Sequence, residues 1–165
     1  MIYMICGSTG AGKTTFALQL AEKHQAVLFS IDEWMENLYG AERNESTELD
    51  WMLERIERCE KQIWEVCLQV SANDKHVILD LGLSKKSHRE KFYQLAESIN
   101  VEVILYFIDV DQETRWQRVQ QRNSERGETF SLEVTRDMFE FMESWFEKPE
   151  SEEHCNLIIN RNSTT

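Results

Sequence analysis

The sequence predicts a three-layer α/β fold built on a parallel sheet of about five strands. Short apolar runs alternate with amphipathic stretches of helical periodicity, and most of the runs are continuously apolar, as strands buried on both faces are. The first run enters a glycine-rich loop, and a helical pattern follows at once. Because 165 residues is close to the size of one ordinary domain, we expect residues 1–165 to form a single domain.

The first half of the chain supplies three of the expected strands and two of the helices. Residues 1–6 and 26–29 are predicted strands, and residues 13–23 form a predicted helix between them. A long helix is expected from about 48 to 70, since its apolar residues recur three or four positions apart, and a strand follows at 76–80. Apolar residues seven apart also allow a coiled coil, but three heptads inside an α/β chain favour packing on the sheet or over a cleft.

The second half continues the alternation. We expect a helix over 86–98, a strand over 101–108, two helices near 111–122 and 131–146, and a last short strand over 156–159. No internal repeat and no linker rich in serine or glycine divides the chain, which again favours one domain.

Composition excludes several classes of protein. With 18 basic and 30 acidic residues the formal charge is −12, which argues against a protein that coats duplex nucleic acid, although a small basic pocket remains compatible with it. A hydrophobic content of 41% argues against a disordered chain. No apolar run approaches the eighteen or so residues of a membrane span.

The cysteines and the N-terminal stretch indicate a cytoplasmic protein. The four cysteines are scattered without a C-x-x-C pair, which is typical of reduced thiols and not of a disulfide or zinc framework. The apolar stretch at 1–6 has no basic residues before it and runs into the glycine loop, so we interpret it as a buried strand and not as a signal peptide.

The loop after the first strand fits the phosphate-binding pattern G-x-x-x-x-G-K-[ST] without a mismatch, in the strand–loop–helix context that the pattern requires. Its glycines let backbone N–H groups converge on a polyphosphate, where the helix N-terminus adds partial positive charge. Lys13 is expected to reach the β- and γ-phosphates, and the Thr14 hydroxyl to bind Mg²⁺. The predicted nucleotide-binding residues are Gly7, Ser8, Thr9, Gly10, Ala11, Gly12, Lys13, Thr14 and Thr15. The motif makes the expected fold that of a P-loop NTPase, and the absence of an evident guanine-reading motif favours ATP over GTP.

Two carboxylates follow apolar strands, at the edge of the sheet where ligands bind in open α/β folds. Asp80 closes the strand at 76–80 and is predicted to hold Mg²⁺ directly or through water; the alternative is a helix cap or a solvated loop acid. Asp32 comes just past the second strand and is predicted to accept the proton of an incoming hydroxyl. Its alternative is the N-cap of a helix over 33–39, which would commit the carboxylate to backbone N–H groups.

Four of the ten arginines fall within twelve residues, at Arg115, Arg118, Arg122 and Arg126. A planar guanidinium suits phosphate, so we expect a lid over 115–130 that brings arginines onto a transferring phosphoryl group. The alternative is a solvated helix face whose arginines pair with nearby acids. For Arg115 and Arg118 both interpretations stay open, whereas Arg122 and Arg126 favour phosphate.

The order of these features resembles the P-loop hydroxyl kinases, which include polynucleotide 5′-hydroxyl kinase, chloramphenicol phosphotransferase and the zeta-type toxin kinases. The most specific stretch is 122–127, followed by a helix with Val134, Arg136, Met138 and Met142, and it looks like the lid of the polynucleotide kinase domain.

The resemblance implies a role for each matching residue. Lys13 and Thr14 would bind phosphates and metal, and Asp32 would be the general base on the acceptor hydroxyl. Asp80 would occupy the Walker-B-like position. Arg126 would be the lid arginine on the nucleotide phosphates, with Arg122 beside it.

One departure concerns the acceptor. The polynucleotide kinase has a basic residue three positions after the base, and Met35 stands there in this chain; no lysine or arginine occurs from 33 to 42, while three glutamates do. An acidic approach repels a polyanion, so a neutral or cationic small hydroxyl compound fits the acceptor-side segment 32–72 better than nucleic acid. Arg43, Arg55 and Arg58 can still supply a basic contact. Trp34, Tyr39 and Trp51 are candidate walls of the acceptor pocket, although core or rim positions are more typical of such aromatics.

These observations favour an ATP- and Mg²⁺-dependent kinase that phosphorylates a hydroxyl of a small molecule. Two alternatives stay open. One is a nucleic-acid 5′-hydroxyl kinase, and the other is an NTP-dependent switch that acts on a protein partner through the helix at 48–70. The sequence does not identify the acceptor or the oligomeric state.

Overall fold

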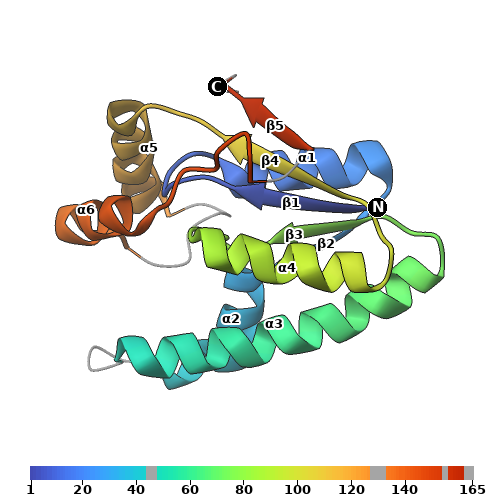
Figure 1. Ribbon diagram of the computed structural model, residues 1–165. Coiled ribbons are helices and arrows are strands. Elements are labelled where there is room, and N and C mark those ends of the chain that lie inside the picture. The colour runs from blue at the N-terminus through green and yellow to red at the C-terminus, as the bar shows by residue number, and fades with distance from the viewer. Residues whose placement is uncertain (44–47, 127–132, 154–155, 162–165) are drawn as a thin grey trace.

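One parallel sheet forms the centre of the molecule (Figure 1). The computed structural model describes residues 1–43, 48–126, 133–153 and 156–161. Within these residues five strands pair in parallel in the order β2-β3-β1-β4-β5. The strands are β1 (Ile2–Cys6), β2 (Val27–Ser30), β3 (Val77–Asp80), β4 (Val103–Ile108) and β5 (Leu157–Asn160). The predicted α/β fold with about five parallel strands is confirmed.

Of the six α-helices in the described residues, five lie near the ranges that the sequence predicts, and the second of the six is expected only as the alternative to a catalytic role for Asp32. They are α1 (Lys13–His24), α2 (Ile31–Tyr39), α3 (Leu49–Ala72), α4 (Lys86–Ser98), α5 (Gln112–Glu125) and α6 (Arg136–Trp145). The predicted start of the last helix, at 131, is wrong, since residues 133–135 are not helical and residues 131–132 lie outside the described part. The helix begins later because the Thr135 hydroxyl accepts a hydrogen bond from the Met138 N–H at 3.3 Å and caps it.

The register of the sheet brings the functional motifs to one edge. β1 lies between β3 and β4, with Tyr3 opposite Ile78 on one side and Ile104 on the other. On the far side of β3, Ser30 pairs with Asp80. Because all the strands run in parallel, their carboxyl ends share an edge, and the glycine loop, the end of β2 and the end of β3 meet there.

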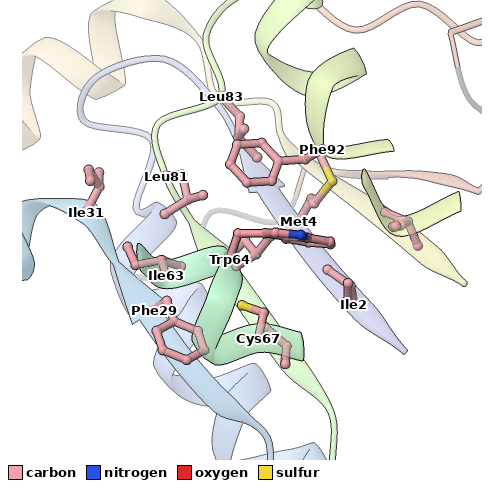
Figure 2. Close-up of a cluster of buried hydrophobic side chains, with 14 of the residues drawn as sticks. Ile2, Met4, Phe29, Ile31, Ile63, Trp64, Cys67, Leu81, Leu83 and Phe92 are labelled. Atoms are coloured by element: carbon pink, nitrogen blue, oxygen red, sulfur yellow. The ribbon is translucent and has the colours of Figure 1, made fainter. Parts of the chain in front are cut away.

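Helices cover both faces of the sheet. On one face α3 and α4 bury side chains of β1 to β4, and Figure 2 shows Trp64 of α3 and Phe92 of α4 close to Met4 of β1. On the other face α1 packs Ala17 and Leu20 against the sheet. The second half of α3 thus packs on the sheet, as an α/β chain favours, whereas Leu49 and Leu53 near its start are exposed.

Two further features are the absence of a membrane-spanning helix in the described ranges and the state of the described cysteines. None of the helices in the described ranges has the length and apolar character needed to cross a bilayer. The cysteines that the structure describes, Cys6, Cys59 and Cys67, are buried free thiols.

Candidate functional site

The glycine loop joins β1 to α1, and its shape depends on two glycines. Gly10 has φ +79°, and a Cβ there would lie 2.5 Å from the backbone oxygen of Arg115. Gly12 has φ +93° and caps α1 in the left-handed conformation. Any other residue would strain the backbone at both positions, so the curled loop requires its glycines.

Lys13 and Thr14 begin α1 and point to groups at the end of the sheet. The Lys13 Nζ donates to the Ser8 carbonyl at 3.3 Å, within the loop. The Thr14 hydroxyl donates to the Asp80 carboxylate at 3.1 Å, which joins the loop to the end of β3. The loop therefore presents one ammonium group and one hydroxyl–carboxylate pair to the same space.

Asp80 is a buried carboxylate, only 5% exposed, at the end of β3. Burial raises its pKa above the ordinary value; the charge of Asp32 also raises this pKa, whereas Lys13 and the Thr14 hydroxyl lower it. Such burial does not fit the alternative of a solvated loop acid. A buried carboxylate is costly to ionise by itself, and a nearby cation offsets this cost. Such an environment is typical of carboxylates that bind cations.

The oxygen donors of Thr14 and Asp80 fit Mg²⁺ bound together with a nucleotide. Mg²⁺ is usually held by one or two protein oxygens, with water and substrate phosphates completing the shell. Within the described ranges no three His, Cys, Asp or Glu side chains cluster closely enough to hold a metal by themselves. The residues present thus suit a cation that arrives with polyphosphate and not a permanent structural metal.

Asp32 is the second residue of α2 and is exposed. The Ser30 hydroxyl caps this helix by accepting a hydrogen bond from the Glu33 N–H at 3.4 Å. The alternative that Asp32 itself caps a helix beginning at 33 is therefore wrong, because the helix begins at Ile31. The carboxylate of Asp32 is not used in capping, and it lies close enough to Asp80 for its charge to raise the pKa of that residue.

Arg115 has a role that neither interpretation of the arginine cluster predicts. It is 5% exposed, and its guanidinium donates to both carboxylate oxygens of Glu143, at 2.6 Å for the Nη2 contact. It also donates to the carbonyls of Val110 at 2.8 Å and Thr9 at 3.2 Å. Arg115 is therefore not a solvated side chain, and it does not line the cavity described below. It links α5 to α6 and to the glycine loop. Glu143 lies 28 residues away, and no local spacing indicates the pair.

The other three arginines separate into two groups. Arg118 lies over the loop and donates to the Ala11 carbonyl at 3.3 Å, and Arg122 has a buried Nε with no hydrogen-bond partner in the described residues. Both side chains line the cavity described below. Arg126 ends α5 in the left-handed conformation, 65% exposed, with Glu133 at 3.5 Å, and it does not line that cavity. Of the two predicted phosphate-binding arginines, the structure therefore brings one, Arg122, to the cavity that the loop lines. Residues 127–130 of the predicted lid lie outside the described part.

These groups surround a cavity of about 550 Å³ above the carboxyl ends of the strands. Polar side chains on its wall come from the loop and from Asp32, Asp80, Ser84, Arg43, Arg118 and Arg122. Apolar side chains come from Met52, Val119, Val134, Met138, Met142, Trp145 and Phe146. Trp34, Tyr39 and Trp51, which the sequence suggested as possible walls, do not line it: Trp34 packs on Phe29, and Tyr39 packs on Trp51.

A larger cavity, of about 610 Å³, lies near the end of α4 and the start of β4. Its wall includes Glu90, Glu97 and Glu102 and none of the loop residues. An acidic wall repels a triphosphate, so the smaller cavity is the candidate nucleotide site despite its size.

Comparison with known proteins places the chain in a family. The profile of a family described as an AAA domain matches residues 2–149. A sequence comparison with curated proteins gives no significant match.

Solved structures share the fold at low sequence identity. Chaetomium thermophilum Kti12 in complex with ADP-AlF3 is 19% identical, with a TM-score of 0.72 over 97% of this chain and 88% of that one. The Mycobacterium tuberculosis APS kinase CysC in complex with AMPPNP and APS is 13% identical, with a TM-score of 0.63 over 98% of this chain and 89% of that one. A gluconokinase from Sinorhizobium meliloti is 17% identical, with a TM-score of 0.58 over 95% of this chain and 79% of that one. At these identities the likeness concerns the fold alone.

Proposed function

The chain belongs to the AAA-domain family, and from this membership we propose that it is an ATP- and Mg²⁺-dependent kinase that transfers the γ-phosphate to a hydroxyl of a small molecule. One observation carries the proposal: a single cavity is lined both by the phosphate loop and by a carboxylate that caps no helix, Asp32. A nucleotide switch needs the loop and the carboxylate of Asp80 at the end of β3. It has no use for the exposed carboxylate of Asp32 after β2, the strand that neighbours β3.

The proposed reaction is a direct transfer between two oxygens. The acceptor oxygen attacks the γ-phosphorus and forms a new P–O bond, while the bond from that phosphorus to the β–γ bridging oxygen breaks and ADP leaves. The acceptor's proton passes to the carboxylate of Asp32. Positioning and charge neutralisation supply most of the rate, because little covalent chemistry is left to the protein.

The cationic side chains of the cavity hold the phosphates. Lys13 and the backbone of the loop would bind the β- and γ-phosphates. Arg122, whose buried Nε has no hydrogen-bond partner in the described residues, would bind the γ-phosphate, and Arg118 would support the loop beside it. Bound Mg²⁺ would neutralise phosphate charge, and Thr14 and Asp80 are the residues that would hold it.

The similar structures support transfer to a hydroxyl over a simple binding switch. Two of them are named as kinases, a gluconokinase and an APS kinase, and the APS kinase was solved with AMPPNP and APS. Kti12, solved with ADP-AlF3, supports nucleotide binding only. The buried free thiols of Cys6 and Cys67, whose pKa burial raises to about 12, favour a cytoplasmic location for the proposed enzyme.

The test is the pair of variants Asp32→Asn and Glu33→Gln, assayed with labelled ATP over a panel of nucleosides, antibiotics and sugars. Glu33 is the matched control, an exposed neighbouring acid that does not line the cavity. Asp32→Asn is expected to lower kcat by roughly 10²–10⁴-fold, because the general base is lost, with the Kd for ATP changed only a few-fold. Glu33→Gln should leave both unchanged. If Asp32→Asn weakens ATP binding as much as it slows transfer, Asp32 is not the base.

A nucleic-acid 5′-hydroxyl kinase is the second candidate, because Arg43 lines the same cavity as Asp32. Arg43, however, already forms an ion pair with Glu36, which removes much of its attraction for a phosphate backbone. Oligonucleotides with a free 5′-hydroxyl belong in the panel, and label on them but on no small acceptor would make this candidate the function.

A further inference from the structure

Helix α6 turns a row of large apolar side chains toward the cavity. Met138, Met142 and Trp145 stand four and three positions apart, so they share one face of the helix, and all three line the cavity. Met138 is 38% exposed and Trp145 is 42% exposed. Apolar surface left open beside a carboxylate and a phosphate loop is costly in water, and it indicates a surface that a ligand covers.

This wall is held in position from both ends. At its start, Val134 and Phe139 form a small buried cluster with Val119 of α5. At its end, the Trp145 ring lies 4.4 Å from the Lys85 Nζ and stacks on Phe141, with the two ring centroids 6.0 Å apart.

Two hydrogen bonds fix the chain that follows α6. The Glu147 N–H donates to the Ser84 carbonyl, and the Lys86 N–H donates to the Glu147 carboxylate, both at 2.8 Å. The end of α6 is thus anchored to the segment that follows Asp80.

The two ends of α6 adjoin different segments of the chain. Its start lies against α5, the helix that carries Arg118 and Arg122, and its end lies against the β3–α4 segment. Asp32 follows β2, and β2 neighbours β3 in the sheet. The Trp145 end of the wall thus lines the same cavity as Asp32, and the Met138 end adjoins the helix that carries the arginines.

The charges around the cavity indicate the kind of acceptor. Apart from Lys13 of the loop and the arginines of α5, the described charged side chains that line it are Asp32, Asp80 and Arg43, and Arg43 is paired with Glu36. Lys85, whose Nζ lies over the Trp145 ring, is paired with Glu147. An anionic acceptor would find no unpaired cation among them, while Met52, Met142 and Trp145 offer sulfur and ring surfaces suited to a flat apolar group.

Resting on the proposed kinase function, we propose that the acceptor is an uncharged alcohol with an aromatic ring, which packs against Trp145 and Met142 and presents its hydroxyl to Asp32. The transfer is the one given above: the acceptor oxygen gains the γ-phosphoryl group, ADP leaves, and the proton goes to the Asp32 carboxylate. Trp145 sets which acceptor binds and takes no part in the chemistry.

Two assays test the inference on the full chain. Calorimetry on protein loaded with Mg²⁺ and AMPPNP measures binding of 2-phenylethanol, thymidine, sorbitol and gluconate, and labelled ATP measures transfer to the same compounds. The variant is Trp145→Leu, and its matched control is Trp51→Leu, a ring that packs on Arg55 outside the cavity.

The ring-bearing alcohols are expected to bind and react at least ten-fold better than sorbitol and gluconate. Trp145→Leu should raise their Kd and KM ten-fold or more, with kcat and the KM for ATP within about two-fold of the parent, and Trp51→Leu should change neither. Two results would overturn the inference. One is equal phosphorylation of sorbitol. The other is a rise in the KM for ATP and not in the KM for the acceptor, because the apolar wall would then bind the adenine of ATP. If no compound is phosphorylated but the ring-bearing alcohols bind in a Trp145-dependent manner, the kinase proposal fails and the binding site stands. Absence of such binding overturns the site itself.

Discussion

At the scale of single residues, the arginines show how far chemistry depends on position. Arg115, Arg118, Arg122 and Arg126 carry the same charge within one stretch of chain, yet each has a different environment. Arg115 is buried against Glu143, Arg118 lies on the loop, Arg122 lines the cavity, and Arg126 is exposed beside Glu133. A guanidinium can neutralise a transferring phosphoryl group only if it is within contact distance, so these residues are not interchangeable.

This difference gives a prediction at the residue scale. Arg122→Ala should lower kcat/KM by roughly 10²–10³-fold, since a preorganised donor to the transferring group is lost. Arg126→Ala should lower it by less than about ten-fold, because an exposed, solvated cation contributes little. Steady-state kinetics with saturating acceptor measure both. Equal losses would mean that Arg126 reaches the phosphates during the reaction, as the resemblance to the polynucleotide kinase lid implies.

At the scale of elements, two buried ion pairs hold helices to one another. Arg115 of α5 bridges to Glu143 of α6 and to the Thr9 carbonyl of the loop. On the face of the sheet that α3 and α4 cover, Glu60 of α3 is 4% exposed and meets His88 and Lys91 of α4. Each pair joins elements that are distant in sequence, and the first one also supports the loop that would bind phosphate.

Removal of Arg115 should therefore affect both stability and binding. Arg115→Met leaves the carboxylate of Glu143 without its partner and is expected to lower the free energy of unfolding by about 3 kcal/mol, the usual cost of breaking a buried pair. Urea denaturation followed by tryptophan fluorescence measures this loss. The double variant Arg115→Met/Glu143→Leu should recover part of it, because neither charge is then left unpaired. No recovery would mean that the loss comes from the bonds to the loop carbonyls.

The α3–α4 pair predicts a pH dependence. Burial by itself raises the pKa of Glu60, but the hydrogen bonds and charges of His88 and Lys91, at 2.6 and 2.9 Å, outweigh it and hold the pKa below its ordinary value of 4.5. A lowered folded-state pKa means that the stabilising contribution is complete above pH 4.5 and is lost as pH falls through the folded-state value.

Glu60→Gln should thus cost roughly 2 kcal/mol of unfolding free energy at pH 7, the scale of a broken bond to a charged group. The difference from the parent should shrink as pH falls below 4.5. Urea titrations between pH 7 and pH 3 measure it, with Glu65→Gln on the same helix as the control. A difference that stays constant with pH would rule out a charged Glu60 as the source of the stability.

At the scale of the whole molecule, the acidic surface and the cationic cleft have opposite consequences. The net charge of −12 disfavours polyanions in general, whereas Lys13, Arg118 and Arg122 gather positive charge at one edge of the sheet. A small triphosphate can enter this local field, while a long nucleic acid would also meet the surrounding acids. Binding there stabilises the whole fold, because the loop, α1 and α5 all contribute to the site.

Nucleotide binding should accordingly raise the melting temperature. At a concentration of 100 Kd, Mg²⁺ and AMPPNP add about 2.7 kcal/mol. That amounts to roughly 5–10 °C for a chain of this length. Differential scanning fluorimetry should show this shift in the parent protein and little of it in Lys13→Ala, and removal of Mg²⁺ with EDTA should reduce it. No shift with any purine triphosphate would remove the basis of the kinase proposal.

The topological class and the phosphate loop of this protein could be predicted from its sequence. Both follow from local rules: strand and helix differ in the period of their apolar residues, and the loop needs its glycines and lysine in consecutive positions. The end of β3 at Asp80 and the place of Asp32 just after β2 could be predicted for the same reason, since each depends on the residues next to it.

Which side chains share the cavity could not be predicted in this way, because it depends on the tertiary structure. The cap by Ser30 and the pairing of Arg115 with Glu143 separate groups that look equivalent in sequence, and the pair spans 28 residues. Met142 and Trp145 reach the cavity because the chain after α6 is tied to the segment beyond Asp80. Such contacts depend on the packing of distant elements, and packing distances are not encoded in the spacing of residues along one helix or strand.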